Sequence, residues 1–246
     1  MKFRIFSFLI LVAFLASCSK EKTYEGKSVY VIYSGALESF KNREFNEAAR
    51  EFMEVERQHP YSDWAPKAQL MSAFCHYMDR KYEDSIRILS SLISYYPNYK
   101  YIDYAHYLLA TNYLQQVPTV DRDVSDAVKA RDSFIELSKR YPHSAYATQA
   151  FKDIDLLDNI LAAHEMYVGR YYQNSNNCLA ALERFKVVIN SFSETAQANE
   201  AYFRVIECYL SLGIMEEAHR YYNEMVKSTR ESNWIYKARN ILKKTT

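Results

Sequence analysis

The chain has 246 residues and a formal net charge of +1 at pH 7, with 31 lysine and arginine residues against 30 aspartate and glutamate residues. This balance argues against a nucleic-acid partner, because a nucleic-acid-binding domain presents a clearly basic face. Glycine is scarce, at four residues, whereas there are 23 tyrosines and 13 phenylalanines, a composition that favours an all-helical protein packed by aromatic side chains.

The first 17 residues are predicted to be a bacterial lipoprotein signal peptide. A basic start precedes an apolar run over residues 5–15, and the tetrad Leu-Ala-Ser-Cys follows at 15–18, which is the order of a secretory signal. Eleven helical residues extend about 16 Å, roughly half a hydrocarbon core, so the run is too short to span a membrane. The tetrad resembles the lipobox, in which Cys18 receives lipid. The alternative is an ordinary secretory signal with a chance cysteine.

Residues 18–28 are predicted to be a lipidated polar tether that extends to at most about 35 Å. Two or more acyl chains on Cys18 would anchor the protein stably, because each buried methylene contributes about 0.8 kcal/mol. The sequence therefore indicates a protein held on a bacterial membrane and facing the periplasm.

From residue 29 onward the sequence is built from repeats. Successive units close with an aromatic residue or histidine and then, in three of four cases, with proline: His59-Pro60, Tyr96-Pro97, Tyr141-Pro142 and Phe192-Ser193. Proline lacks an N–H group and clashes with the preceding turn, so each one ends a helix. Two helical segments fit between successive ends, which are roughly 35 to 50 residues apart, and this period is typical of tetratricopeptide repeats.

The predicted fold is all-α: an α-solenoid of about five tetratricopeptide-type helix pairs with a C-terminal capping helix. The first helices of the pairs are expected over 29–41, 65–79, 102–115, 146–172 and 196–212. The repeats are expected to span roughly 29–62, 65–99, 102–144, 146–194 and 196–230, with the capping helix at 234–244. Residues 29–246 form a single superhelix in this prediction, because a helix pair buries its apolar stripe only against its neighbours.

A small residue recurs near the start of each second helix, and a large residue follows four positions later. The pairs are Ala48 and Phe52, Ser85 and Leu89, Ala130 and Phe134, Ala181 and Phe185, and Ala218 and Tyr222. The small residue lets two helix backbones approach, and the large one fills the space beside it. This order, with a proline twelve residues after the small position in the first three units, resembles the tetratricopeptide consensus.

The concave wall of such a superhelix is formed mainly by its first helices. Tyr33, Tyr77 and Tyr104 are the candidate residues for holding a polypeptide on this wall, together with Tyr107 and Tyr113. The alternative for each tyrosine is packing between helices.

Two features depart from a plain array. A loop over 116–123 separates the helices of the third repeat, and the first helix of the fourth repeat is longer than one repeat needs. Long loops in compact proteins are often functional.

The sequence contains no familiar catalytic or metal-binding pattern. The pair His164-Glu165 lacks the second histidine of a zinc-binding helix, and there is no CxxC pair, phosphate-binding glycine loop or GxSxG motif. Cys75, Cys178 and Cys208 lack metal-ligand spacing and are interpreted as buried apolar residues, with a disulfide as the alternative. The sequence therefore predicts a binding protein and not an enzyme, with no cofactor and no metal.

The span 120–172 resembles one family in particular. It contains Asp121-Arg122-Asp123, then Phe134-x-x-Leu137-x-x-x-Tyr141-Pro142-x-Ser144-x-Tyr146, then Leu161-Ala162-x-His164-Glu165-x-x-Val168-x-x-Tyr171-Tyr172. With the lipobox, the loop in the third repeat and the long helix, these strings resemble the BamD (ComL) family, the tetratricopeptide lipoproteins of the outer-membrane β-barrel assembly machinery. The resemblance covers the mature chain but departs at 173–178 and at Ser193, where the family usually has an Arg-Gly-aromatic turn and a proline.

The resemblance implies a scaffold anchored by lipid to the periplasmic side of the outer membrane. Its N-terminal repeats would receive unfolded outer-membrane protein clients. Repeats four and five would dock on the periplasmic domains of the central barrel-forming insertase, beside other lipoproteins of the machinery. Arg184 matches a family arginine, and Tyr171 and Tyr172 are candidate anchors, since tyrosine is frequent in hot spots. The alternatives are a solvated arginine and tyrosines that pack against the fourth repeat.

A different envelope function stays open as an alternative. A lipidated tetratricopeptide adaptor for a cell-wall or division complex, or a pilotin for pilus or secretin assembly, would be built on the same array. A periplasmic cell-wall adaptor that shares the array without lipid would also lack the third-repeat loop, and a lipidated pilotin would lack the pattern over 121–172.

Overall fold

The computed structural model describes residues 24–228 and 232–245, and all regular secondary structure within them is α-helical. The helices are α2 (Val29–Lys41), α3 (Phe45–Gln58), α4 (Trp64–Met78), α5 (Tyr82–Tyr95), α6 (Ile102–Gln115), α7 (Ser125–Arg140), α8 (Ala145–Asn174), α9 (Cys178–Ser191), α10 (Ala198–Ser211), α11 (Met215–Ser228) and α12 (Asn233–Thr245). Within these ranges no helix combines the length and the apolarity needed to cross a membrane. The predicted signal peptide and Cys18 lie outside the described residues.

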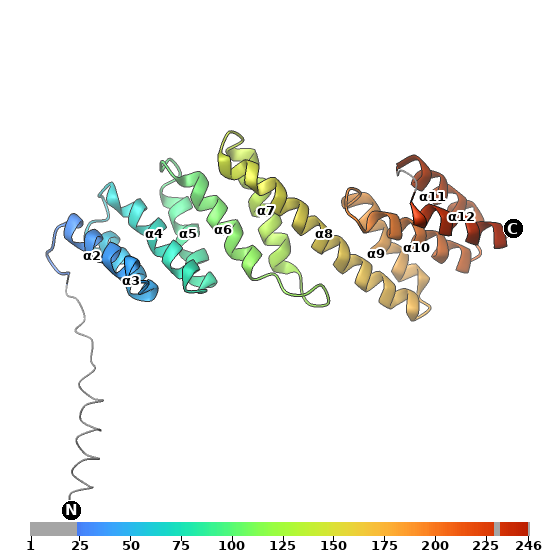
Figure 1. Ribbon diagram of the computed structural model, residues 1–246, viewed down its shortest axis with the longest axis horizontal. Helices are drawn as coiled ribbons and strands as arrows, with labels where there is room; N and C mark the ends of the chain where they lie inside the picture. Colours follow the sequence, from blue (N-terminus) through green and yellow to red (C-terminus); the bar gives the residue numbers. More distant parts are fainter. Residues whose placement is uncertain (1–23, 229–231, 246) are drawn as a thin grey trace, which may run out of the picture.

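The helices follow one another along an elongated array, in the order of the chain (Figure 1). Each helix packs against the next, from α2 on α3 to α10 on α11, and the first helices of the N-terminal pairs also touch, α2 with α4 and α4 with α6. Helix α12 packs on α10 and α11 and closes the stack. The predicted α-solenoid with a capping helix is therefore confirmed.

The recurring small residues of the second helices are buried in the core. The five positions are fully inaccessible: Ala48, Ser85, Ala130, Ala181 and Ala218. The large residues that follow four of them are equally buried: Phe52, Leu89, Phe134 and Phe185. The Ser85 hydroxyl donates to the carbonyl oxygen of Ala73 at 2.8 Å, so burial leaves this polar group satisfied.

Four predicted helix ends share one backbone geometry. The residues after α3, α5, α7 and α9 have φ values of −135°, −127°, −128° and −135°: His59, Tyr96, Tyr141 and Phe192. The N–H group of each donates to the carbonyl oxygen four residues earlier, which closes the last helical turn. The fourth end has this geometry although Ser193 replaces the proline, so the degenerate end is confirmed as well.

Tight turns join the two helices within most pairs. In four pairs, one turn residue has a positive φ: Arg43, Arg80, Asn176 and Gly213. The left-handed conformation costs about 1–2 kcal/mol for residues other than glycine, so these turns depend on the packing of the helices that they join. The third pair has instead the predicted longer connection, which runs from α6 to α7 over residues 116–124.

Helix α8, the first helix of the fourth pair, links the three N-terminal pairs to the rest of the array. It has 30 residues, which corresponds to about 45 Å at 1.5 Å per residue. It packs against both α7 and α9 and also touches α6 and α10. Its first turn is capped by Ser144, whose hydroxyl oxygen accepts from the N–H group of Tyr146. The long first helix of the fourth repeat is therefore present, with ends slightly beyond the predicted 146–172.

The residues just before α2, at the C-terminal end of the predicted tether, contact the first repeat. Tyr24 is buried, and its hydroxyl donates to Glu51 Oε1 at 2.7 Å. The Ser39 hydroxyl donates to the other oxygen of Glu51 at 2.6 Å. His59 Nε2 lies 2.9 Å from the carbonyl oxygen of Lys27, across the same repeat. We call residues 24–28 with these contacts the N-terminal clasp.

Candidate interaction surfaces

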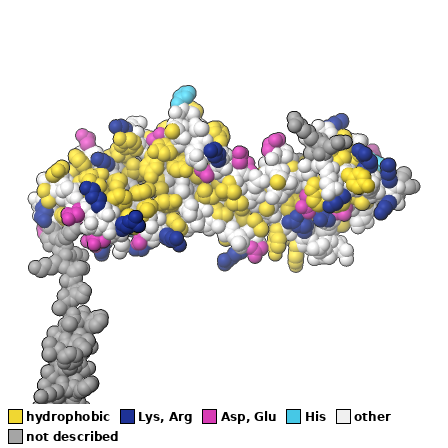
Figure 2. Space-filling view, viewed as in Figure 1, with side chains coloured by type: hydrophobic (Ala, Val, Ile, Leu, Met, Phe, Trp, Pro, Cys, Tyr) yellow, Lys and Arg dark blue, Asp and Glu magenta, His cyan; other side chains and the backbone are white. Residues whose placement is uncertain are grey.

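A row of aromatic rings crosses the N-terminal half of the array. We call it the aromatic row, and its members are Phe40, Phe74, Tyr77, Tyr104, Tyr107 and Tyr146, all half-buried. The centroid distances are 6.1 Å for Phe40–Phe74, 6.3 Å for Phe74–Tyr77, 5.1 Å for Tyr104–Tyr146 and 5.3 Å for Tyr107–Tyr146. Figure 2 shows hydrophobic side chains gathered over this half of the molecule. The row therefore presents apolar surface to solvent.

Tyr77 and Tyr104, two predicted residues of the concave wall, belong to this row. Burial raises the pKa of the Tyr104 hydroxyl to about 12, and the neighbouring Tyr146 adds to the effect. Burial also raises the pKa of Tyr77. Both hydroxyl groups therefore stay protonated at neutral pH and are able to donate hydrogen bonds.

The third predicted residue, Tyr33, is a core residue. Its side chain is 4 % exposed, and its ring packs edge-on against Phe52 at 5.1 Å and Trp64 at 4.8 Å. The ammonium group of Lys67 covers the ring at 4.9 Å. Tyr33 is therefore not available to a bound polypeptide, and packing between helices is its role.

An acidic residue lies at one end of the aromatic row. Asp153 of α8 is half-buried, and burial raises the pKa of its carboxyl group. Its charge is close enough to Tyr107 to raise the pKa of that hydroxyl. The row thus combines apolar rings with hydroxyl donors and, at this end, one carboxylate.

The predicted insertase-side arginine lies at the junction of α8 and α9. Arg184 is exposed, and its Nη1 atom lies 3.3 Å from Glu165 Oε2 of α8. The side chain of Glu165 is only 19 % exposed, whereas that of Arg184 is 45 % exposed. The guanidinium group is therefore held by Glu165 on one side and faces solvent on the other. An arginine held in this way is suited to a second carboxylate from a partner.

The two predicted tyrosine anchors have different environments. Tyr171 is 65 % exposed, whereas Tyr172 packs on the C-terminal hydrophobic core. Their rings contact edge to face at 5.7 Å. Tyr171 therefore belongs to the surface near the end of α8, and Tyr172 packs between the ring of Tyr171 and the core.

A charged cluster that the sequence did not single out links α8 to α10. Arg170 Nη1 lies 3.0 Å from Glu200 Oε1, which also receives Arg204 Nε at 3.2 Å. Arg204 Nη1 in turn lies 2.9 Å from Glu207 Oε2, and Gln173 donates to the same oxygen at 3.3 Å. The cluster joins the first helix of the fifth pair to the long helix.

The third-repeat loop is attached to α8. His164 Nδ1 lies 2.7 Å from the carbonyl oxygen of Val120, so this nitrogen carries the proton and donates. Asp123 accepts from the N–H group of Ser125 at 3.0 Å at the start of α7. His164 is thus a structural residue that holds the loop against the long helix.

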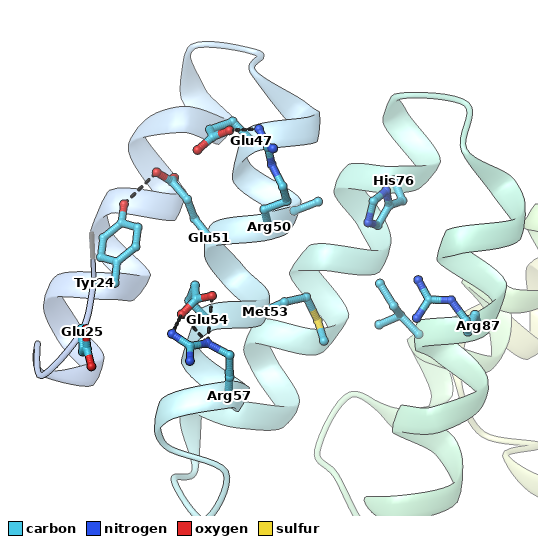
Figure 3. A pocket seen from close by; sticks show the side chains of 12 residues that line it. Tyr24, Glu25, Glu47, Arg50, Glu51, Met53, Glu54, Arg57, His76 and Arg87 are labelled. Atoms are coloured by element: carbon cyan, nitrogen blue, oxygen red, sulfur yellow. Dashed lines mark hydrogen bonds and ion pairs between the residues drawn. The ribbon is translucent and has the colours of Figure 1, made fainter. Parts of the chain in front are cut away.

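A hollow of about 560 Å³ is lined by residues of α3, α4, α5 and the N-terminal clasp (Figure 3). Three arginines reach it, but each pairs with a carboxylate three residues earlier: Arg50 with Glu47, Arg57 with Glu54 at 2.7 Å, and Arg87 with Asp84 at 3.1 Å. The hollow therefore has no surplus positive charge with which to bind an anion.

The three described cysteines are buried free thiols: Cys75, Cys178 and Cys208. Burial raises the pKa of the Cys75 thiol to about 12, so it is unreactive at neutral pH. Their interpretation as buried apolar residues is confirmed. In the described ranges, 24–228 and 232–245, no cluster of histidine, cysteine or acidic residues is arranged to hold a metal ion.

Solved structures with a similar course of the chain are tetratricopeptide proteins. The TPR2AB domain of yeast Sti1 is 14 % identical, with a TM-score of 0.43, and the match covers 88 % of this chain and 84 % of that one. A thermophilic TPR protein from Thermus thermophilus is 14 % identical, with a TM-score of 0.41, and the match covers 89 % and 98 %. These similarities are distant, and the fold assignment stands on the helix pairs themselves.

Sequence relatives are much closer. The outer membrane protein assembly factor BamD of Caulobacter vibrioides is 38 % identical over 217 residues, which cover 86 % of this chain and 71 % of that protein. The protein of the same name from Rickettsia prowazekii is 30 % identical over 237 residues, which cover 96 % and 94 %. The YfiO family model, described as outer membrane lipoprotein, matches residues 26–225. The chain therefore belongs to the YfiO family of outer membrane lipoproteins, the family of BamD.

Proposed function

We propose that this protein is a lipid-anchored scaffold on the periplasmic side of the outer membrane and that it acts in the assembly of outer-membrane proteins. The match of the family model to residues 26–225 carries this proposal, and the relatives named above are outer membrane protein assembly factors. An assembly factor of this kind works by binding, and the protein is not an enzyme.

The aromatic row is the proposed surface for unfolded clients. Its half-buried rings offer apolar contact, and the protonated hydroxyls of Tyr77 and Tyr104 offer donors to the backbone carbonyl groups of an extended segment. Unfolded outer-membrane proteins consist of strand segments in which every second side chain is apolar. One apolar face of such a segment would lie along the rings, while its backbone would accept from the tyrosine hydroxyls.

The junction of α8 and α9 is the proposed surface for the periplasmic domains of the insertase. Tyr171 is exposed there, and Arg184 is held by Glu165 with one side of its guanidinium group in solvent. Tyrosine and arginine are frequent in the centres of protein interfaces. Arg184 would pair with a carboxylate of the insertase, and Tyr171 would pack beside it. Other lipoproteins of the machinery would join the same complex.

Lipid on Cys18 would hold both surfaces near the membrane. Tethering raises the effective concentration of the attached binding sites, so weak contacts with clients suffice. The lipidation proposal rests on the lipobox-like tetrad at 15–18. Mass spectrometry of the mature N-terminus tests it, and an unmodified Cys18 thiol would refute it.

The insertase surface is tested by affinity capture of the full-length protein from solubilised envelopes. We expect Arg184→Glu to reduce recovery of the insertase at least tenfold, because it places a second negative charge beside Glu165. The matched control is Arg140→Glu, an exposed arginine that pairs with Glu136 in α7. Equal recovery with both variants would refute this assignment of the surface.

The client surface is tested by crosslinking to a nascent or urea-unfolded outer-membrane protein. A photoreactive residue at position 77 should crosslink, whereas one at exposed position 236 of α12 should not. Insertase capture should be unchanged in both. Crosslinking at 236 but not at 77 would show that clients bind elsewhere.

A further inference from the structure

Two adjoining hollows open where the first and second repeats end. The first, of about 460 Å³, and the second, of about 310 Å³, share Pro66, Tyr95 and Tyr96. The Tyr96 hydroxyl donates to the carbonyl oxygen of Pro60 at 3.3 Å and so joins the two repeat ends. We call this surface the proline groove, and Pro60, Tyr61, Pro97 and Tyr99 complete its apolar lining.

The groove brings together proline and tyrosine side chains, of which Pro66 is buried and Pro60 and Pro97 are exposed. It contains three of the five prolines of the chain. Tyr61 is fully exposed and Tyr95 is 75 % exposed. An exposed patch of large apolar groups with polar neighbours is typical of an interaction site.

The shape and chemistry of the groove match a polyproline II ligand. Such a ligand is an extended helix with three residues per turn, and it docks in grooves lined by aromatic rings. Its backbone carbonyl groups are not used internally, so they accept hydrogen bonds from a partner. The hydroxyl groups of Tyr61 and Tyr95 have no partner within residues 24–228 and 232–245, and they are available as donors.

Acidic residues in the first hollow favour a ligand with a basic side chain. Glu56 and Asp63 line the first hollow, and within the described part of the chain neither forms an ion pair. The nearby Lys67 is engaged with the rings of Tyr33 and Trp64 at 4.9 and 4.8 Å. The first hollow is therefore acidic, and it favours a lysine or arginine next to the prolines of a ligand.

We propose that the proline groove binds an extended polypeptide segment that has two prolines three residues apart and a basic residue beside them. The prolines would occupy the two hollows on either side of Tyr95, because positions three apart face the same side of a polyproline II helix. The basic residue would pair with Glu56 or Asp63 and fix the direction of the segment. This site is additional to the surfaces proposed for clients and the insertase.

The test uses the full-length protein in detergent and three fluorescein-labelled decapeptides. The first has two prolines three residues apart and one arginine before them. The second has the same composition in scrambled order, and the third has glutamate in place of arginine. Fluorescence anisotropy measures the affinity of each. We expect the first peptide to bind at least tenfold more tightly than the other two.

Two groove variants and one control then localise the site. The double variant Tyr61→Ala/Tyr95→Ala should weaken binding of the first peptide about tenfold, since rings of this kind dominate interface energies. The double variant Glu56→Gln/Asp63→Asn should abolish the preference for arginine over glutamate. The control Tyr236→Ala removes an equally exposed tyrosine from α12 and should change nothing.

Circular dichroism melting verifies that each variant is folded; these side chains are on the surface, and their loss should leave the transition unchanged. Equal affinity for the ordered and scrambled peptides would refute the proposal, as would an equal loss of affinity in Tyr236→Ala. Capture of the insertase by the groove variants should stay normal. This separates the failure of this site from the failure of the proposed assembly function.

Discussion

Gly169 of α8 faces the ring of Phe185 in α9 at a distance that leaves no room for a side chain. A Cβ atom at position 169 would lie 2.7 Å from Cδ1 and 2.9 Å from Cζ of this ring. Phe185 is fully buried, so its ring has no free space into which to move. The close approach of α8 to α9 therefore requires glycine at position 169.

Replacement Gly169→Ala should destabilise the protein. Overpacking of a dense core costs about 1–3 kcal/mol, while alanine recovers up to about 1 kcal/mol of helix propensity. We expect a net loss of about 1–2 kcal/mol in the free energy of unfolding, measured by urea denaturation. A second change, Phe185→Leu, should make the alanine less harmful than it is alone. Stabilisation by Gly169→Ala would contradict the close packing of Gly169 against the Phe185 ring.

Replacement Tyr24→Phe tests the N-terminal clasp. The variant keeps the buried ring but loses the hydrogen bond to Glu51, which should cost about 1–3 kcal/mol locally because the bond is to a buried carboxylate. The Lys27 amide, which donates to the carbonyl oxygen of Tyr24 at 3.0 Å, should exchange faster, while exchange in α8 should stay the same. Tyr30→Phe, at a tyrosine that is 71 % exposed, is the control. Unchanged exchange in Tyr24→Phe would show that the hydroxyl does not hold the clasp.

Stability should fall with acidification because of a buried histidine. His106 is 4 % exposed and packs against the Tyr141 ring at 5.4 Å. Burial lowers its pKa, and Arg140 adds to this, whereas Glu136 and Asp103 oppose it. The unfolded chain therefore takes up a proton more readily than the folded chain, and stability is lost as the pH falls below about 6.5.

This dependence is measured from urea midpoints between pH 7.5 and pH 5. His106→Leu should flatten the curve, whereas the exposed His143→Gln should leave it as in the parent protein. His76, whose pKa is also lowered by burial, should keep part of the slope in both. A slope unchanged by His106→Leu would exclude His106 as a source.

Replacement His164→Phe should release the third-repeat loop. The aromatic ring is kept, but the hydrogen bond to the carbonyl oxygen of Val120 is lost, at a cost of about 0.5–1.5 kcal/mol. Proteolysis within 116–124 should become faster, with little change in the melting of the whole array. His143→Phe is the control, and equal proteolysis of the two variants would contradict a role for His164 in holding the loop.

The repeat core was predictable because it follows from local rules. The small residues, such as Ala48 and Ala181, recur at fixed distances from the helix ends, and each helix pair buries the same positions against its neighbours. The backbone conformation of the turns within the helix pairs was harder to predict. Arg43 and Arg80 adopt a left-handed conformation that arginine does not favour, so only the packing of the two joined helices determines it.

The surfaces were predictable only in part, because exposure depends on what the neighbouring repeat covers. Tyr33 and Tyr77 both lie on first helices, but Trp64 of the next pair covers only Tyr33. Tyr171 and Tyr172 are adjacent, and successive residues on a helix point about 100° apart. One of them therefore faces solvent and the other faces the core. The sequence alone does not reveal which of the two tyrosines faces solvent.

If the protein is anchored through Cys18, the N-terminal clasp also limits how far the first repeat lies from the membrane. With residues 24–28 held against the first repeat, the leash from Cys18 to Tyr24 cannot exceed about 20 Å, compared with about 35 Å for a leash that ends at residue 28. The volume that the first repeat is able to sweep scales with the cube of this length, so it falls to about one fifth. If Cys18 carries lipid as proposed, the first repeat stays within a shallow layer above the bilayer.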